Sequence, residues 1–402
     1  MEIKILKNAS GIFGTILNGH VLEKSEQPSD MEGINTISYY MHNIDDNISE
    51  ELVPLIKKYH IGKIKNCSSS SNYIYFTNVF NNENEENRGT VSIIRYNISE
   101  QTMESIYSFD DNIPDYATKM RLNVYVINDM YLFLQKDYLV KNLKNTYAGF
   151  FKFKIKFLNL RDKSVYDITD DKIIKYGISD ILQISETQCV IKTGFCLLND
   201  NIYNELEQEE ASLESISFIN IGQLASDLVI AQDNIVLDTI EQAFYTKTIP
   251  YIKKQDNYLV YTCVDNENKQ EEVKFYHLET GEIKSCINQD VIKMTDLAQP
   301  YVIAGEPYIC VTKDNDISFL NLNSGKVDVN FDMTSFSEDT KLQKILKSSL
   351  LFSGTTQKKL FKKSRPFIDL YSFPGKEILF HETGEYDDCI ETEDETIYII
   401  EK

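Results

Sequence analysis

Short extended segments alternate with turn-forming residues along the whole chain. Two of these segments use almost the same nine-residue phrase, FYHLETGEI from Phe275 to Ile283 and FLNLNSGKV from Phe319 to Val327. In both, a bulky first residue and an apolar fourth residue precede four turn-forming residues, and an aliphatic ninth residue begins the next segment. The residues before the turn are rich in β-branched and aromatic side chains, so each phrase predicts a β-hairpin with glycine in its turn.

Five further copies of the phrase occur. They are MHNIDDNIS from Met41, RYNISEQTM from Arg95, FLNLRDKSV from Phe157, FINIGQLAS from Phe218 and LYSFPGKEI from Leu370. The fourth residues of the seven copies recur at intervals of roughly 44 to 62 residues, within the range of propeller and solenoid repeats. These residues are Ile44, Ile98, Leu160, Ile221, Leu278, Leu322 and Phe373.

The third position of the phrase is polar in every copy. It holds Asn43, Asn97, Asn159, Asn220, His277, Asn321 and Ser372. Side chains of this kind at a strand end hydrogen-bond the backbone of the following turn. We therefore interpret His277 as a turn cap and not as a catalytic base.

Each phrase is preceded by a more apolar strand-like run, as in NYIYFTNV from Asn72 and NYLVYTCV from Asn257, and by a fainter one before that. Each repeat is therefore predicted to be a four-stranded antiparallel meander of about 50 residues. One meander cannot bury both of its faces, and radial stacking of several meanders solves this problem. The predicted fold class is all-β: a seven-bladed β-propeller of four-stranded antiparallel blades, forming a single domain over residues 1–402.

Strands without hairpin partners occur at both ends, MEIKILKN at the start and DCIETED and ETIYIIEK at the end. Their pairing would close the ring and remove exposed strand edges. If they form a complete extra sheet, the number of blades becomes eight; paired β-sandwiches are a less favoured alternative. Residues 232–247, a segment beginning at Asn47 and residues 339–348 have spacings that also fit short helices.

On these repeats the chain resembles the β-propeller superfamily in general. It matches no particular family within it, because the chain has no Trp and so lacks the WD dipeptide of WD40 blades and the tryptophan docking motif of quinoprotein-like blades. The Asp-box of sialidases and the Gly-Gly pairs of kelch repeats are also missing. No functional residue is carried over from those families.

The composition excludes some partners. The net charge is −21 and the pI about 4.7, so phosphate backbones and anionic membranes are repelled, and no nucleic-acid or membrane partner is expected. No signal peptide or apolar span is evident, and the seven cysteines are scattered without a C-x-x-C pair. We expect a cytoplasmic protein with reduced thiols. The abundance of Asn, Ile, Lys and Tyr suggests an AT-rich bacterial genome.

The sequence contains none of the common catalytic, phosphate-binding or metal-binding motifs. There is no G-x-S-x-G elbow, no phosphate-binding G-x-x-x-x-G-K-[ST] loop and no metal-ligand spacing, so neither a cofactor nor a metal is predicted. The five histidines are widely separated in the sequence: His20, His42, His60, His277 and His381.

The innermost strands of a propeller line its central channel. In this chain, those strands are predicted to include IGKIKNC, ISDILQIS and DDCIETED. The candidate channel residues are therefore Lys63, Lys65, Asp180, Gln183, Asp388 and Glu391.

Two basic segments contrast with the acidic background. QKKLFKKSR is a candidate docking patch for an acidic partner, formed by Lys358, Lys359, Lys362, Lys363 and Arg365. In FKFKIKF, Lys152, Lys154 and Lys156 alternate with apolar residues, which places them on one face of a strand. Either that hairpin projects beyond the blade, or its lysines meet an acidic partner.

The failure of every catalytic motif favours a non-catalytic binding or scaffold module that presents its loops to a protein or peptide partner. The alternative is a hydrolase or lyase acting on a polar ligand in the central channel. That alternative requires Asp, Glu, His or Lys side chains with shifted pKa values to converge in one place.

Overall fold

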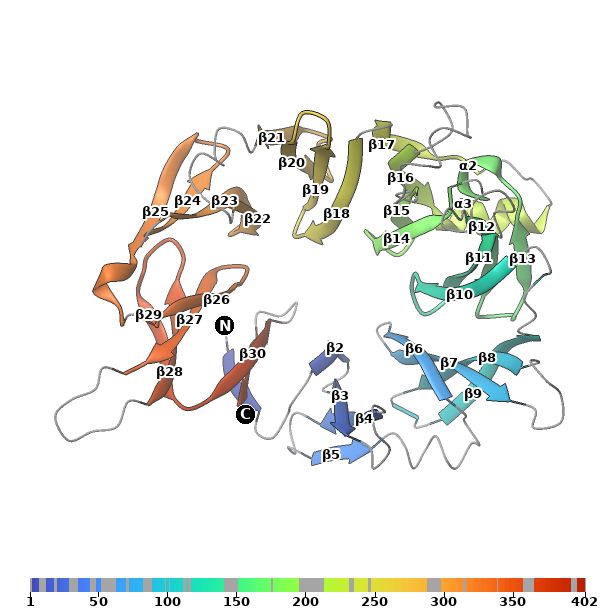
Figure 1. Cartoon of the computed structure of the whole chain (residues 1–402), viewed down its shortest axis with the longest axis horizontal. Helices are drawn as coiled ribbons and strands as arrows, with labels where there is room; N and C mark the ends of the chain where they lie inside the picture. The colour runs from blue at the N-terminus through green and yellow to red at the C-terminus, as the bar shows by residue number, and fades with distance from the viewer. Residues whose placement is uncertain are drawn as a thin grey trace. The chain divides into compact units, whose positions relative to one another are not determined.

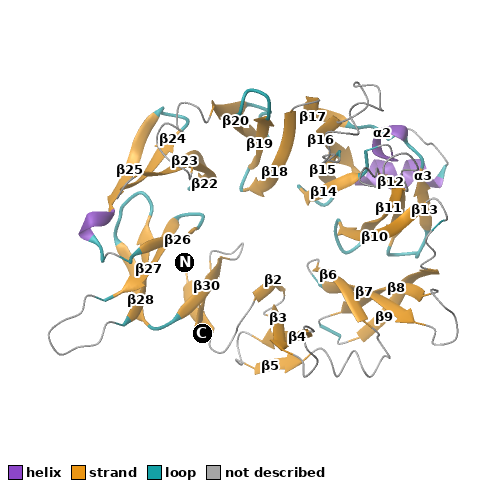
Figure 2. Ribbon diagram, viewed as in Figure 1, coloured by secondary structure: helices purple, strands orange, loops and turns teal. Residues whose placement is uncertain are grey.

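The computed structural model shows the chain as a series of small sheets with very little helix (Figures 1 and 2). The described residues are 2–6, 12–17, 20–28, 35–43, 48–51, 63–69, 72–81, 89–97, 99–100, 102–110, 114, 117–140, 151–174, 176–194, 213–230, 235–244, 247–287, 298–313, 316–337, 339–356, 365–391 and 396–401. The chain divides into two compact units. We call residues 13–22 and 26–248 the N-terminal unit, and residues 1–12, 23–25 and 249–402 the C-terminal unit.

Four sheets belong wholly or largely to the N-terminal unit, and each has four strands in the order of the chain. The first has β2 (Ile12–Leu17), β3 (His20–Pro28), β4 (Asn35–Asn43) and β5 (Ile48–Glu51). The second has β6 (Lys63–Ser69), β7 (Tyr73–Asn81), β8 (Gly89–Asn97) and β9 (Thr102–Asp110). The third has β10 (Ala117–Val126), β11 (Tyr131–Val140), β12 (Phe151–Asn159) and β13 (Val165–Ile168). The fourth has β14 (Ile178–Gln183), β15 (Gln188–Thr193), β16 (Leu213–Asn220) and β17 (Asp238–Phe244).

Three more four-stranded sheets belong wholly or largely to the C-terminal unit. The first has β18 (Lys247–Gln255), β19 (Tyr258–Asp265), β20 (Gln270–His277) and β21 (Ile283–Ile287). The second has β22 (Ala298–Ile303), β23 (Glu306–Lys313), β24 (Asp316–Asn321) and β25 (Lys326–Asp332). The third has β26 (Lys341–Ile345), β27 (Ser349–Thr355), β28 (Pro366–Ser372) and β29 (Ile378–Thr383). The short helical elements among the described residues are α2 (Asp171–Ile174), α3 (Ile221–Val229) and η2 (Met333–Ser335).

The two ends of the chain pair with each other. Strand β31 (Thr396–Glu401) lies between β1 (Glu2–Leu6), to which it is parallel, and β30 (Tyr386–Glu391), to which it is antiparallel. The first five residues of β31 are buried, as expected for a strand covered on both faces. The seven four-stranded antiparallel sheets confirm the predicted blades of a seven-bladed β-propeller, and the three-stranded sheet of the two ends is additional to them.

Six of the seven turn caps predicted for the third position of the phrase are present, and the side chain of the seventh residue, Asn43, lies outside the described part of the structure. The acceptor atoms of the six caps receive hydrogen bonds from turn amides two to five residues further on. The bonds are Asn97 Oδ1 from Glu100 (3.0 Å), Asn159 Oδ1 from Arg161 (3.0 Å), Asn220 Oδ1 from Gln223 (2.9 Å), His277 Nδ1 from Glu279 and Thr280 (both 3.3 Å), Asn321 Oδ1 from Asn323 (2.7 Å) and Ser324 (3.1 Å), and Ser372 Oγ from Glu377 (2.9 Å). The interpretation of His277 as a turn cap is confirmed.

The seventh position of the phrase has a left-handed backbone in four copies. Gly281 and Gly325 have φ values of 71° and 68°, and Lys163 and Lys376 take the same conformation at 61° and 59°. Glycine occupies this conformation at little cost, whereas a lysine there is strained. The turn geometry is therefore imposed by the repeat and not by glycine alone.

One copy of the phrase departs from the hairpin. After Asn220 the chain enters α3, with the Asn220 side chain as its N-cap, and returns to the sheet only at β17. The alternative of a helix over residues 232–247 is wrong, because residues 238–244 pair with β16 and Phe244 is 47% exposed. The helical alternatives at Asn47 and at residues 339–348 are wrong where described, since β5 and β26 are strands.

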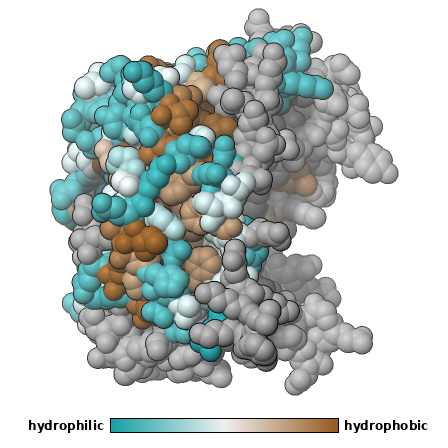
Figure 3. Space-filling view, turned by 90° about the vertical axis from the view of Figure 1, so that its left-hand side faces the viewer, coloured by the Kyte–Doolittle hydropathy of each residue, from teal (hydrophilic) through white to brown (hydrophobic). Residues whose placement is uncertain are grey.

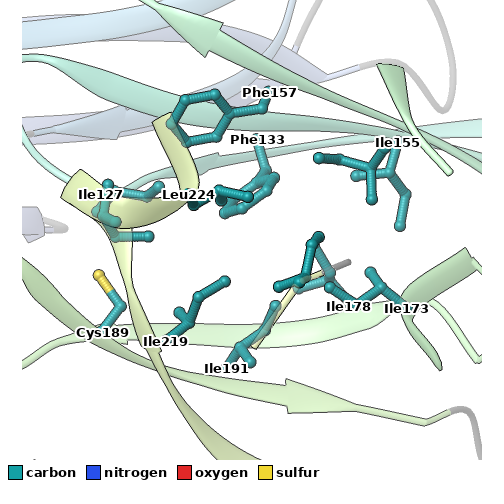
Figure 4. Packing of buried hydrophobic residues seen from close by; sticks show 13 residues of the cluster. Ile127, Phe133, Ile155, Phe157, Ile173, Ile178, Cys189, Ile191, Ile219 and Leu224 are labelled. Atoms are coloured by element: carbon teal, nitrogen blue, oxygen red, sulfur yellow. The ribbon is translucent and has the colours of Figure 1, made fainter. Parts of the chain in front are cut away.

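Apolar side chains fill the space between neighbouring sheets. Figure 4 shows Phe133 and Phe157 of the β10–β13 sheet packed toward Cys189, Ile191 and other apolar residues of the β14–β17 sheet. The ninth residues of three phrases are not part of this buried core. Ile283, Val327 and Ile378 lie in the first two positions of outer strands and are 47%, 56% and 57% exposed. Figure 3 shows hydrophobic patches among hydrophilic residues on the side of the molecule that carries β25 and β29.

Candidate functional site

The first residue of β14 is held by side chains of the preceding sheet. The Gln135 carboxamide accepts a hydrogen bond from the Ile178 amide at 2.6 Å and donates one to the Ile178 carbonyl at 2.9 Å. The Tyr125 hydroxyl donates to the same carbonyl at 2.7 Å. Because Gln135 is buried, these bonds fix the position of β14 relative to β10 and β11 within the N-terminal unit.

The buried carboxylate of Asp137 accepts a hydrogen bond from Gln135. Asp137 is 1% exposed, and its two oxygens accept hydrogen bonds from Gln135 Nε2 and Asn123 Nδ2, both at 2.8 Å. A buried charge is tolerated only when it is hydrogen-bonded in this way. Asp137 therefore orients Gln135, which in turn positions the start of β14.

Asp180 follows two residues later on β14. The register with β15 shifts between Ile178 and Asp180, so Ser179 is the extra residue of a bulge, and Asp180 is paired across the ladder with Lys192. Bulges of this kind re-aim side chains, often beside functional sites. Burial raises the pKa of the Asp180 carboxyl, and the opposing effects of the Ile181 amide (2.8 Å) and the Lys192 charge do not cancel this.

Lys192 lies between two acidic side chains. Its Nζ is 3.5 Å from Oε2 of Glu214, and the two side chains are only 11% and 5% exposed. The adjacent pair, Thr193 and Ser215, shares a buried hydroxyl hydrogen bond of 2.7 Å. Glu214, on β16, forms an ion pair with Lys192 on β15. Asp180, on β14, is paired with Lys192 across the β14–β15 ladder.

We call Asp180, Lys192 and Glu214 the β14 cluster. A carboxyl whose pKa is raised binds a proton more readily than an ordinary carboxyl and can act as a general base and acid. A neighbouring ammonium can stabilise negative charge that develops on a substrate oxygen. The cluster therefore brings acidic and basic side chains onto neighbouring strands, and one of them, Asp180, has a raised pKa.

Among the six predicted channel residues, Asp180 alone belongs to this cluster. Gln183, also on β14, is exposed and donates to the Ser185 carbonyl at 3.2 Å. Glu391 on β30 accepts a hydrogen bond from the Lys347 amide at 2.6 Å. Lys63, Lys65 and Asp388 are strand residues of β6 and β30 whose side chains lie outside the described part of the structure.

The basic segments are described only in part. Lys358, Lys359, Lys362 and Lys363 lie outside the described residues. The Arg365 carbonyl accepts a hydrogen bond from the Thr356 amide at 2.8 Å, and the Arg365 amide donates one to the Thr356 hydroxyl at 2.9 Å.

The alternation in β12 is confirmed, since Lys152 and Lys154 are exposed while Ile155 and Phe157 are buried. The β11–β12 ladder continues to Phe151, whereas β13 pairs only as far as Ile155, so the hairpin extends beyond its outer strand.

Lys192 and Glu214 were missed by the sequence analysis. The one available signal was a lysine within the apolar run QCVIKTGF, because a lysine in a buried strand requires a partner. His381 was considered only for metal spacing, yet its Nδ1 lies 2.5 Å from Asp369 Oδ1 across the β28–β29 ladder. Among the described residues, no group of three His, Cys, Asp or Glu side chains is arranged to hold a metal ion.

No protein-family model matches the chain, and no curated protein matches it by sequence. Similar solved structures include a prolyl endopeptidase (9% identity, 95% of this chain and 52% of that one, TM-score 0.46). The acylaminoacyl peptidase of Pyrococcus horikoshii is another (9%, 92% and 51%, TM-score 0.47). A third is the β-propeller domain of the Trilobed protease of Pyrococcus furiosus (8%, 89% and 92%, TM-score 0.44). The chain spans about half the length of the first two.

At 8 to 9% identity, these likenesses show the fold alone. All three similar structures are peptidases or part of one and none is a non-catalytic scaffold, so the prediction of a scaffold is not upheld. No helix in the described part of the chain has the length and apolar character needed to cross a membrane.

Proposed function

We propose that the chain is a hydrolase that acts on a polar substrate at the β14 cluster, with Asp180 as the group that accepts and returns the proton. The observation that supports this most is the raised pKa of Asp180 at a bulge opposite Lys192, which is itself held by Glu214. The structures described above are peptidases, so the peptide bond is the first substrate class to test.

The proposed reaction needs only water and the substrate. The Asp180 carboxylate accepts a proton from water while the water oxygen bonds to the carbonyl carbon, and the carbonyl electron pair moves to its oxygen. The Lys192 ammonium stabilises that oxygen. The protonated Asp180 then donates to the leaving nitrogen as the carbon–nitrogen bond breaks. A carboxyl with a raised pKa suits both steps, because it is a stronger base toward water than an ordinary carboxylate and can still return the proton to the leaving nitrogen.

The test is digestion of a mixture of unstructured peptides by the full chain in ¹⁸O-labelled water, followed by mass spectrometry. We expect new C-termini that carry ¹⁸O, and a fall in kcat/KM of about a hundredfold or more in Asp180→Asn. Asp316→Asn, which changes an exposed aspartate on β24, is the matched control and is expected to retain full activity.

Three outcomes would overturn the proposal. The first is the absence of turnover of peptides, glycosides and phosphate esters by the wild-type chain. The second is turnover that Asp180→Asn leaves unchanged. The third is formation of products without ¹⁸O, because they indicate elimination by a lyase and not hydrolysis.

A further inference from the structure

A separate pocket of about 290 Å³ lies beside α3, at the end of β15 opposite to Lys192. Gln188, the first residue of β15, contributes to its wall, and Lys192 is four residues further along the same strand. At the rise of a β-strand this separates the two sites by about 13 Å. The pocket is therefore not part of the β14 cluster.

The floor of the pocket is apolar and is formed by buried side chains. Ile219, Leu224 and Ile235 are 2%, 4% and 7% exposed, and all three belong to the core between the β10–β13 and β14–β17 sheets (Figure 4). The rim contains Val236, which is 75% exposed. A preformed pocket of this volume, at the lower end of the usual range for ligand sites, fits an apolar group of the size of one amino-acid side chain.

The charged side chains that line the pocket in the described part of the structure are acidic. Asp227 on α3 and Asp238 on β17 both line the pocket, and none of the described residues that line it is basic. Asp227 Oδ1 accepts a hydrogen bond from Gln223 Nε2 at 2.7 Å, which holds the carboxylate in place. Asp227 also lies in the last turn of α3, where the helix dipole is negative and the last turn contains no basic side chain.

We propose that this pocket binds a primary ammonium group attached to an apolar body. The apolar part occupies the floor over Leu224 and Ile235, and the ammonium lies between Asp227 and Asp238. A free alkylamine or arylalkylamine has this chemistry, and so does a peptide N-terminus that begins with an apolar residue. This inference does not depend on the proposed hydrolysis.

Calorimetric titration of the full chain with 2-phenylethylamine and with its neutral analogue 2-phenylethanol tests the proposal. We expect the amine to bind and the alcohol to bind at least about fivefold more weakly. Asp227→Asn and Asp238→Asn should each weaken amine binding roughly two- to fivefold, the effect of losing one partly exposed charge pair. Asp316→Asn is again the control that should change nothing.

Val236→Arg supplies an independent test, because it places a cation on an exposed rim position without disturbing the core. We expect it to abolish amine binding. A phenylalanine-initiated tripeptide and its N-acetylated form separate the two sources of the ligand. Binding of the free peptide in preference to the free amine assigns the site to peptide N-termini, and the reverse order assigns it to free amines.

Three results would overturn the inference. They are equal binding of 2-phenylethylamine and 2-phenylethanol, binding of the acetylated peptide as tightly as the free one, and no heat of binding from any probe at millimolar concentration. These three results concern binding at the pocket. A failure of the proposed hydrolysis would be seen separately, in the turnover measured for the wild type and Asp180→Asn.

Discussion

His381 Nδ1 lies 2.5 Å from Oδ1 of Asp369, directly across the β28–β29 ladder. The Asp369 side chain is 11% exposed and that of His381 is 54% exposed, so the histidine satisfies a buried carboxylate from the solvent side. Tyr371 also hydrogen-bonds Asp369; burial, followed by the charge of Asp369, raises the pKa of its hydroxyl.

We therefore predict that His381→Ala destabilises the protein by about 1 to 3 kcal/mol, the cost of removing a partner from a buried charged group. Urea unfolding at neutral pH measures the change. Glu382→Ala, at the next position of β29, is the control and should have a smaller effect. A His381→Ala variant as stable as the wild type would show that Tyr371 alone satisfies Asp369.

The turn caps give a second prediction. His277→Ala and Asn321→Ala should each lower the free energy of unfolding by about 1 kcal/mol, because both remove a side-chain acceptor for turn amides. His277→Asn should restore most of the loss, since asparagine fills this position in five other copies of the phrase. If His277→Asn is as damaging as His277→Ala, capping is not the role of this side chain.

Asp180 gives a prediction about pH. Burial raises its pKa in the folded protein, so the folded state holds the proton more tightly than the unfolded state. The stability from this group is fully present below the unfolded pKa of about 3.9 and is lost as the pH rises through the folded pKa. Asp180→Asn removes the penalty of ionisation and should be at least as stable as the wild type at neutral pH.

Urea unfolding of both proteins as a function of pH checks this prediction. The advantage of Asp180→Asn should shrink as the pH falls toward the unfolded pKa, and Asp316→Asn should follow the wild type. A variant less stable than the wild type at neutral pH would contradict the prediction. Asp180→Asn is expected to lower activity without lowering stability. This combination distinguishes a catalytic role of Asp180 from a structural one.

The buried thiols give a fourth prediction. Burial raises the pKa of Cys189 and Cys310 to about 12, so almost no thiolate is present at mildly alkaline pH. Alkylation followed by mass spectrometry should label both residues only after unfolding in urea. Cys286, which is partly exposed, should be labelled faster in the folded protein. Labelling of Cys189 at the rate of Cys286 would indicate that the core between the two sheets opens readily.

The local features of the fold follow from the sequence itself. The turn caps, the left-handed seventh position and the alternation in β12 all depend on residues within a few positions of each other, so the repeated phrase predicts them. The number of four-stranded sheets follows from the same repeat. Helix and strand were confused at residues 238–244, where an amphipathic spacing fits either structure until the strand pairs with β16.

The residues of the candidate site could be identified only from the tertiary structure. Lys192 and Glu214 are on neighbouring strands, Gln135 and Ile178 are on neighbouring sheets, and His381 meets Asp369 only because of the β28–β29 register. A one-residue shift of register moves every side chain of a strand to the other face. The sequence alone therefore determined which segments form hairpins and how each turn is capped, because those interactions are short in range. Tertiary structure decided which charged groups meet, because that depends on register, bulges and the packing of one sheet against the next.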